Sequence, residues 1–313
     1  MSASKEAVCR LVLVMLISIA ALLASAASGT AAEAASTAEA PRRAEGRELS
    51  STAREASEAR ESTYANVYVQ TSAEYRACCH CIYTVAGLRL AELMEEFLDE
   101  ETSTMLRPAV VMDLDQTVLD NSSFQTFLYE NGLDYTPELW SRFEREGVEE
   151  VELVPGAKRF IERAEELGVT VVYLSNRNRA NQEWTVRALA RVGIDTTGIA
   201  RRMYLKPEGG SSDKTPRRDA IGARHNVLMY FGDNLRDFSD VFEARELPDD
   251  ASAGAYGEAV EDRAAAVDLA LCHWGFDWFV LPNPMYGEWE QHIPSEPVDI
   301  LRPTSMRRIE GDD

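Results

Sequence analysis

Short apolar runs alternate with amphipathic segments through the middle of this 313-residue chain, and this alternation restricts the fold more than any other feature. Three apolar runs read AVVMD (109–113), VTVVYLSN (169–176) and NVLMYFGD (226–233). Helical patterning follows at 155–168, which has Pro near its start and Gly at its end, and at 180–192. A short strand at 203–205 and a short helix after Asp213 complete the series. Strands separated by helices predict an α/β fold with a parallel sheet covered on both faces.

Polar side chains stand at the ends of the three predicted strands. Asp113, Ser175 and Asp233 each close one of them. Because working sites in parallel sheets lie beyond the carboxyl ends of the strands, we expect these groups to meet at one rim. Asp115 lies only two residues after Asp113, and two carboxylates so close repel each other. A chain that places them together needs a compensating charge.

A divalent cation would compensate Asp113, Asp115, Asp233 and Asp237. Oxygen ligands with little nitrogen or sulfur favour a hard ion, most simply Mg²⁺. A metal there also attracts phosphate, and Lys214 in GGSSDK (209–214) adds a cation for it, as Ser175 adds a hydroxyl. The sequence therefore predicts a phosphate-handling metal site.

The paired aspartates can divide one reaction between them. Asp113 is placed to attack phosphorus and form an aspartyl phosphate, provided that the charges are screened. Asp115 can give a proton to the leaving alcohol and later accept one from the hydrolytic water. Taken alone, D-x-D at a strand end is more often a polar turn. That alternative loses weight because a serine, a lysine and a G-D-N-x-x-D segment follow in order.

The chain resembles haloacid-dehalogenase (HAD) superfamily phosphatases in DLDQT (113–117), LSNR (174–177), SDK (212–214) and GDNLRDF (232–238). It resembles class C acid phosphatases, the bacterial lipoprotein e and 5'-nucleotidase group, more narrowly in VMDLDQTVLDN, VPGA (154–157) and LPNPMYGEW (281–289). The likeness runs from about residue 70 to 289. It implies a HAD-like, Rossmann-like parallel sheet flanked by helices, with a small cap and N-terminal helices.

The resemblance also implies roles for the motif residues. Asp113 would be the nucleophile and Asp115 the acid/base. Mg²⁺ would be held by the Asp113 carboxylate, the Asp115 backbone carbonyl and Asp233, with Asp237 supporting the metal or its waters. Phosphate would be held by Ser175, Asn176 and Lys214. Gln116 departs from the Glu that members often carry, and the lipidation cysteine of many relatives is absent.

The segment 119–154 is too long for a simple loop and is expected to form the cap. Trp140 in TPELW and Tyr286 in NPMYGEW match the family's aromatic pair, which would hold a substrate base between two rings. The resemblance favours nucleoside 5'-monophosphates, and nicotinamide mononucleotide remains open. From the sequence alone, both rings could equally be core aromatics.

The N-terminus resembles an export signal. Lys5 and Arg10 precede fourteen apolar residues (11–24), fewer than the roughly 20 that span a bilayer, and small residues follow. We expect a signal peptide at 1–26 and a disordered Ala/Ser/Glu-rich leader at 27–62. The phosphatase domain then covers 63–300, with a tail at 301–313. The protein would be periplasmic or extracellular and not lipidated, although a retained anchor is the alternative.

Residues 64–100 carry Tyr75, Tyr83, Leu90, Leu93 and Phe97 at helical spacing, so one or two helices should pack on the sheet. The same stretch holds the cluster CCHC (78–81). It lacks the spacing of zinc sites, which favours buried thiols or a disulfide to Cys272.

Composition excludes several partners. The formal net charge of −21 repels polyanions, so nucleic acid polymers are not expected to bind.

The sequence lacks the motifs of several other enzyme classes. The context of a phosphohistidine enzyme is missing around His80, His225, His273 and His292, and no G-x-S-x-G, P-loop or G-x-G-x-x-G is present. A non-catalytic exported binding or storage protein and a phosphotransferase remain alternatives, and a homodimer is compatible with the sequence.

Overall fold

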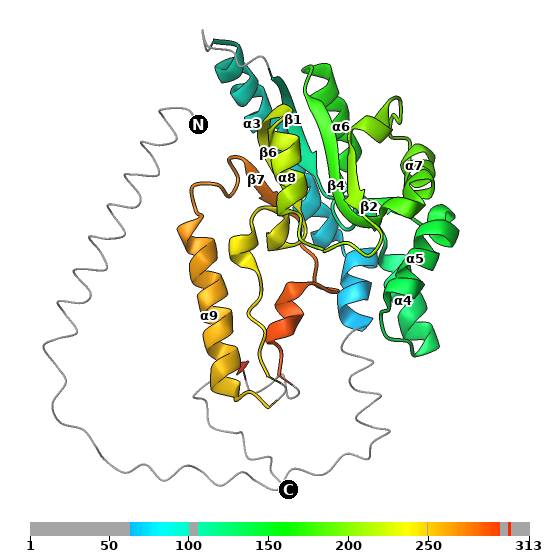
Figure 1. The fold of residues 1–313 in the computed structure, drawn as a ribbon, viewed down its shortest axis with the longest axis vertical. Helices are drawn as coiled ribbons and strands as arrows, with labels where there is room; N and C mark the ends of the chain where they lie inside the picture. Colours follow the sequence, from blue (N-terminus) through cyan, green and yellow to red (C-terminus); the bar gives the residue numbers. More distant parts are fainter. Residues whose placement is uncertain (1–62, 100–105, 249, 295–299, 302–313) are drawn as a thin grey trace, which may run out of the picture. The chain divides into compact units, whose positions relative to one another are not determined.

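The computed structural model describes residues 63–99, 106–248, 250–294 and 300–301. Five parallel strands form one sheet in the order β5-β4-β1-β6-β7 (Figure 1). Their bounds are β1 Arg107–Met112, β4 Thr170–Asn178, β5 Met203–Lys206, β6 His225–Gly232 and β7 Trp278–Val280. The predicted α/β fold with a parallel sheet is confirmed.

Helices cover both faces of the sheet, as the continuous apolar strands predicted. Val110 and Met112 of β1 belong to the larger core, with α3 and α6, whereas Ala109 and Val111 face a smaller cluster that includes Ile221 of α8. The helices are α3 Ala73–Asp99, α6 Ala157–Glu166, α7 Gln182–Arg191 and α8 Thr215–Gly222. The helix predicted at 180–192 begins later, because residues 179–181 form a 3₁₀ turn.

The chain reverses its direction across the sheet at β1. From β1 it proceeds through β4 to β5 on one side, and then returns to β6 and β7 on the other. The Asp113 N–H, just past β1, donates to the Phe231 carbonyl of β6 at 2.9 Å. Sheets of this kind bind ligands beyond the strand ends at such a switch point. The carboxyl ends of β1 and β6 are therefore the expected site.

The N-terminal segment is helical at 63–71 and again in α3, which confirms the predicted one or two helices. Tyr75, Tyr83 and Leu90 are buried against the sheet. The Tyr83 ring stacks on Phe231 with ring centroids 5.7 Å apart, and its hydroxyl donates to the Thr117 carbonyl at 2.6 Å. Through these contacts α3 supports the loop that carries Asp113 and Asp115.

Two helices and a two-stranded ribbon occupy the segment expected to form a cap. They are β2 Leu119–Asp120, α4 Ser122–Asn131, α5 Pro137–Glu146, η1 Gly147–Glu149 and β3 Glu152–Leu153. Antiparallel pairing of β2 with β3 joins the two ends of the insertion. Thr136 caps α5 by accepting from the Leu139 N–H, and Pro137 starts the helix.

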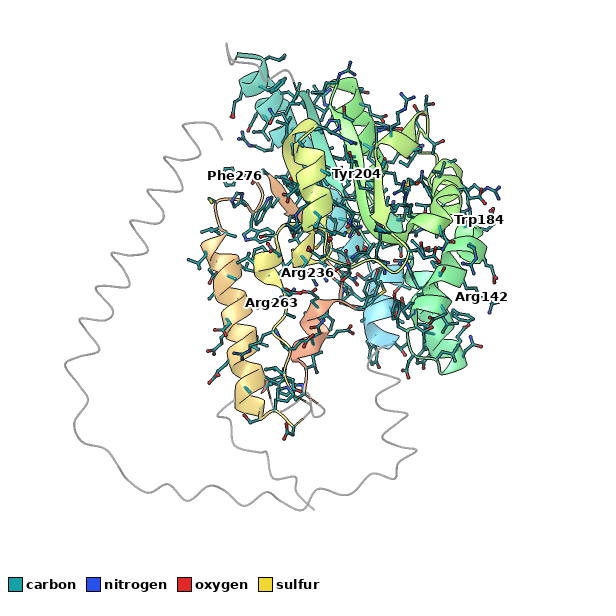
Figure 2. The ribbon with its side chains drawn as sticks, in the orientation of Figure 1. Arg142, Trp184, Tyr204, Arg236, Arg263 and Phe276 are labelled. Carbon is teal, nitrogen blue, oxygen red and sulfur yellow. The ribbon has the colours of Figure 1, made fainter. Side chains whose placement is uncertain are left out.

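Two C-terminal elements were not predicted. The strand β7 has only three residues, which is too short for a periodic pattern. The helix α9 (Ala253–Leu269) is alanine-rich, and only Ala259 is buried within it, so the sequence shows no apolar stripe. Arg263 of α9 and Arg236 are both labelled in Figure 2. Their guanidinium groups lie 4.0 and 2.9 Å from the carboxylate of Glu288. These ion pairs join α9 to the segment that bears Tyr286.

The prediction for the cysteines was wrong in part. Cys79 is buried, but Cys78 and Cys81 are exposed, and no disulfide joins any of them to Cys272. Cys78 and Cys81 are exposed because the buried face of α3 is formed by Tyr75, Cys79 and Tyr83. The signal peptide, the leader and most of the tail lie outside the described residues. Within the described ranges, no helix has the length and apolar character of a membrane span.

Candidate active site

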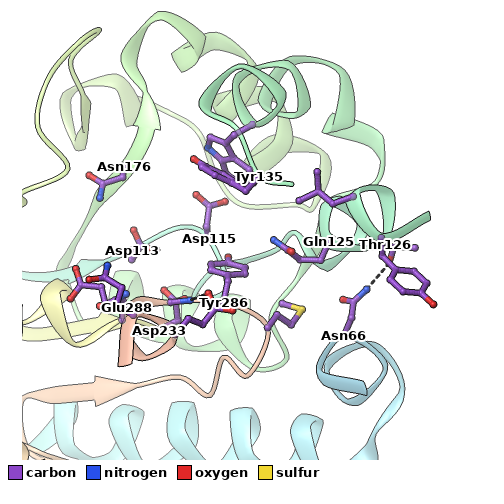
Figure 3. A pocket seen from close by; sticks show the side chains of 18 of the residues that line it. Asn66, Asp113, Asp115, Gln125, Thr126, Tyr135, Asn176, Asp233, Tyr286 and Glu288 are labelled. Atoms are coloured by element: carbon purple, nitrogen blue, oxygen red, sulfur yellow. Dashed lines mark hydrogen bonds between the residues drawn. The ribbon is translucent and has the colours of Figure 1, made fainter. Parts of the chain in front are cut away.

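A pocket of about 930 Å³ opens at the carboxyl ends of β1 and β6 (Figure 3). Asp113, Asp115 and Asp233 line one part of it, and the cap, the 285–291 segment and the N-terminal helix at 63–71 line other parts. The volume lies near the upper end of the range for small-molecule sites, about 300–1,000 Å³. A phosphoryl group would fill only a small part of this space.

The base of the pocket is a network of carboxylates around one lysine. Lys214 Nζ lies 2.5 Å from Asp113 Oδ1 and 2.6 Å from Asp237 Oδ1, and all three side chains are buried. Lys214 stands at the start of α8, while Asp237 follows β6. The second oxygen of Asp237 accepts from the Asn234 N–H at 3.0 Å. Residues from three separate parts of the sequence therefore meet at one point.

Asp233 completes an acidic cluster. Oxygens of Asp113, Asp233 and Asp237 lie within 4.8 Å of one another, and Asn283 Nδ2 donates to Asp233 Oδ2 at 2.7 Å. Such a set of oxygens fits a hard divalent cation. An Asp237 oxygen lies within the same distance of the other oxygens as those of Asp113 and Asp233 do. Asp237 is therefore a candidate metal ligand, and not only a residue that supports the metal or its waters. Among the described residues, this is the only group of His, Cys, Asp and Glu side chains with metal-binding geometry.

The charges of this cluster are not balanced by the protein alone. Burial raises the pKa of Asp113 to about 7, although Lys214 opposes the shift. Burial and the charges of Asp237 and Asp113 raise the pKa of Asp233 well above its usual value. Burial lowers the pKa of Lys214, but the same carboxylates raise it by more, so the lysine stays charged. A cation is thus attracted to the cluster.

Asp115 has a different partner. Arg177 Nη2 and Nε lie 2.7 and 3.0 Å from Asp115 Oδ1, and 1% of the Arg177 side chain is exposed. Ser175 Oγ is 3.5 Å from Asp115 Oδ2 and accepts from the Arg177 N–H at 3.1 Å. Ser175 is fully buried and does not line the pocket. Its hydroxyl thus contacts Asp115 and Arg177, and its role in holding phosphate stays a prediction.

The loop after Asp113 adopts a backbone conformation that is rare outside glycine. Gln116 has φ of 53° and is fully buried. Its Nε2 donates to Asn121 Oδ1 at 2.6 Å, and the same oxygen accepts from the Tyr286 hydroxyl at 3.3 Å. A glutamate at this position would lack that donor. Gln116 therefore connects the loop after Asp113 to Tyr286 through Asn121.

The cap and the C-terminal segment supply facing aromatic surfaces. Asp115 lies between Tyr135 on one side and Tyr286 on the other (Figure 3), and Trp140 lines the same pocket. Trp140 packs on Phe124 with centroids 5.2 Å apart. Burial raises the pKa of Tyr286 far above its usual value, so the phenol stays neutral. Trp140 and Tyr286 are thus pocket residues and not interior core aromatics.

Asn176 and Arg236 bring polar groups to the pocket, and Arg217, which does not line it, contacts Asn176. Asn176 lines it, and Asn176 Oδ1 accepts from Arg217 Nη2 at 2.6 Å. Arg217 also donates to the Ser175 carbonyl at 2.8 Å. Arg236 lines the pocket while it pairs with Glu288. Hence Lys214 and Arg236 are the cations that line the described pocket.

Sequence analysis identified most of these groups and missed several, among them Tyr135 and Arg236. The structure brings together Asp113, Asp115, Asp233, Asp237, Lys214, Asn176, Trp140 and Tyr286. It adds Arg177, Arg217 and Asn283, which hold Asp115, Asn176 and Asp233. Arg177 belongs to the LSNR motif, which was an available signal. Asn283 belongs to the LPNPMYGEW stretch, which was also an available signal, whereas nothing local in the sequence marks Arg217. The four histidines do not line the pocket, as expected.

Comparisons with known proteins agree with this geometry. The family model described as HAD superfamily, subfamily IIIB (acid phosphatase), matches residues 25–289. The chain is also similar to the solved structure of a class C acid phosphatase from Bacillus anthracis, and to a second structure of that protein with tungstate bound. In both cases the identity is 29% and the TM-score 0.63, over 79% of this chain and 92% of the other.

Proposed function

Because this chain belongs to subfamily IIIB of the HAD superfamily, the acid phosphatases, and is therefore a phosphomonoesterase, we propose that it is an Mg²⁺-dependent enzyme that works through an aspartyl phosphate. One observation carries the proposal. The Asp113 carboxylate stands at a strand end within a cluster of oxygens that suits a hard cation, and it contacts a buried lysine. A nucleophilic carboxylate needs both forms of charge compensation.

The proposed roles follow the environment of each residue. Asp113 Oδ attacks phosphorus, the P–O bond to the substrate breaks, and its electron pair stays on the leaving oxygen. Asp115 protonates that oxygen and then takes a proton from the water that hydrolyses the intermediate. Lys214 and Asn176 line the pocket and meet the phosphoryl oxygens. Ser175 also orients Asp115 and Arg177, since its hydroxyl contacts both.

The ligands proposed for Mg²⁺ are the carboxylates of Asp113, Asp233 and Asp237, together with the Asp115 backbone carbonyl. The first three are supported by their mutual distances, within 4.8 Å. When bound, such an ion neutralises the nucleophile and the phosphoryl oxygens. Asn283 orients Asp233 by donating to its second oxygen.

Nucleoside 5'-monophosphates are the proposed substrates. Trp140 and Tyr286 line the same pocket as Asp113, and the pocket extends well beyond the space of a phosphate. Rings on both sides of a pocket suit a planar base, and stacking is tolerant of base identity. Nucleotides of several bases should therefore be accepted.

Export is proposed from the N-terminus alone. Lys5, Arg10 and the apolar run 11–24 suit a signal peptide, and no cysteine stands at the expected cleavage point. The mature protein would be periplasmic or extracellular and not lipidated. Fractionation of cells that make the full-length chain, with N-terminal sequencing of the product, tests this. Recovery of intact residues 1–26 in the membrane fraction would contradict it.

The test of the reaction is phosphate release by purified full-length protein. We expect hydrolysis of p-nitrophenyl phosphate and 5'-AMP with Mg²⁺, loss of both after chelation, and recovery when Mg²⁺ is returned. An acid-stable label on Asp113 from a labelled phosphomonoester would support the covalent intermediate. No turnover with Mg²⁺, Mn²⁺ or Co²⁺ would refute the metal-dependent mechanism. Phosphorylated alcohol among the products would indicate phosphotransfer instead of hydrolysis.

A further inference from the structure

Arg177 is a buried cation beside the pocket to which the proposed mechanism assigns no step. It lies on β4, two residues beyond Ser175, and 1% of its side chain is exposed. It does not line the pocket, so a substrate cannot reach it directly. Its guanidinium donates two hydrogen bonds to Asp115 Oδ1, from Nη2 at 2.7 Å and from Nε at 3.0 Å. The Asp115 carboxylate is therefore the pocket group that Arg177 contacts through hydrogen bonds.

The charge of Arg177 is retained in this position. Burial lowers the pKa of Arg177, but the adjacent Asp115 carboxylate raises it by more. Arginine is the cation best suited to such a site, because its planar donors match a carboxylate and it is always protonated. Removing this arginine from water costs free energy, and its contacts with the Asp115 carboxylate offset that cost.

The cap holds the other side of the guanidinium. Arg177 Cζ lies 5.7 Å from the centroid of the Trp140 ring on α5. One turn later on the same helix, Glu144 accepts from the Asn178 N–H at 3.0 Å and from Asn181 Nδ2 at 2.5 Å. These bonds dock α5 onto the end of the strand that carries Arg177. The guanidinium is thus enclosed between Asp115 and the cap.

The two oxygens of Asp115 are bound unequally. Oδ1 accepts both guanidinium nitrogens within 3.0 Å, whereas Oδ2 is 3.2 Å from Nε and 3.5 Å from Ser175 Oγ. The carboxyl is anchored through Oδ1, and Oδ2 has the weaker contacts. Asp115 also lines the pocket, and 17% of its side chain is exposed, so the carboxyl is accessible from the pocket.

We propose that Arg177 is a positioning residue that holds the Asp115 carboxyl with Oδ2 directed at the leaving-group oxygen. This inference rests on the proposed function, in which Asp115 is the acid and base. As the P–O bond breaks, the proton on Oδ2 passes to the leaving oxygen, and Arg177 faces the carboxylate that remains. In the second step the same oxygen takes a proton from water while that water attacks the aspartyl phosphate. Phosphate leaves, and the Asp113 carboxylate is restored.

Leaving-group dependence separates this role from a structural one. Phenol is a weaker acid than p-nitrophenol, so phenyl phosphate depends more on proton delivery than p-nitrophenyl phosphate, while both place a similar ring in the pocket. The variant Arg177→Met should lower kcat/KM for phenyl phosphate about 100-fold, since general acid catalysis contributes about 10²–10⁴. For p-nitrophenyl phosphate we expect a loss of less than about 5-fold. The ratio of the two losses is the measured quantity.

A second variant and a matched control complete the experiment. Arg177→Lys retains the charge but lacks the planar group that donates two hydrogen bonds to a carboxylate. We therefore expect an intermediate loss of about 10-fold in kcat/KM for phenyl phosphate. Arg202→Met removes a partly buried arginine that donates to the Val171 carbonyl away from Asp115, and should change both substrates equally. Equal losses for both substrates in Arg177→Lys would overturn the proposal. An inactive parent enzyme would instead refute the proposed function.

Discussion

The base of the pocket and its cap wall differ in almost every physical respect. The base consists of carboxylates and a lysine, and Asp113 and Lys214 are each 6% exposed. The wall consists of aromatic rings, and Tyr135 is 59% exposed. The base stands on the ends of parallel strands, whereas the wall belongs to an insertion and to the 285–291 segment. The groups proposed to react thus lie at the ends of the sheet strands, and those proposed to select the substrate lie on the insertion and the C-terminal segment.

This difference separates two kinds of effect. A change in the base should alter the rate for every phosphomonoester, because each substrate presents the same phosphoryl group there. A change in the wall should alter the ranking of substrates and leave the smallest ones unaffected. Arg177 connects the two regions, since it touches Asp115 and faces Trp140.

The sharpest test of the base is Asp113→Asn. We expect a loss of at least about 10³-fold in kcat/KM for p-nitrophenyl phosphate and 5'-AMP alike, because the amide cannot form the intermediate. Initial rates with both substrates measure the loss, and a circular dichroism spectrum that matches that of the parent verifies the fold. If this variant kept a tenth of the activity, Asp113 would not be the nucleophile.

Stability of the metal-free protein should depend on pH through the base. The pKa of Asp113 is raised to about 7, and that of Asp233 is raised as well, so the folded state takes up protons that the unfolded state does not. Stability should therefore increase as pH falls through about 7 towards 5, by roughly 5 °C in thermal midpoint. Thermal unfolding after chelation, at pH 8 and pH 5, measures this rise.

The control for this prediction is Asp113→Asn under the same conditions. The overall net charge of −21 also favours lower pH, so the difference in slope between parent and variant isolates the contribution of the site. Bound Mg²⁺ should flatten the slope of the parent, since the cation then supplies the missing charge. Identical slopes in parent and variant would contradict the assigned shift.

The wall is tested by Trp140→Ala. We expect about a 10-fold lower kcat/KM for 5'-AMP, mainly through KM, because base stacking contributes about 1–3 kcal/mol. The rate with p-nitrophenyl phosphate should change less. Steady-state kinetics on both substrates, compared with Trp184→Ala on the outer helix α7, measures the selectivity. Equal AMP kinetics in Trp140→Ala and parent would remove the stacking hypothesis.

The smallest effect is expected at the junction of the two regions. Glu144 is 2% exposed, and its carboxylate accepts from Asn178 and Asn181. Glu144→Gln loses one of these bonds, so the free energy of unfolding should fall by about 1 kcal/mol. KM for 5'-AMP should rise about 2-fold. Chemical denaturation measures the first effect, and Glu146→Gln, an exposed pair with Arg142, serves as the unchanged control.

Local patterns were sufficient for much of the fold. The strands at Asp113, Ser175 and Asp233 were predicted within one or two residues, because buried parallel strands are continuous apolar runs bounded by turn residues. The short strand β7 and the alanine-rich α9 were missed, since neither has a pattern of its own. The exposed Cys78 and Cys81 were placed wrongly, because helical spacing does not say which stripe faces the sheet.

By itself, the sequence determined which side chains stand at the strand ends and in what order, and hence that Asp113, Asp115, Asp233 and Lys214 gather at one rim. Only the tertiary structure decided how those side chains are directed. Ser175 turns inward to Arg177 and Asp115, and Asp237 joins the cluster through Lys214. The physical reason is range: strand and helix patterns depend on neighbouring residues, whereas a side chain's direction depends on charges that fold against it from distant segments.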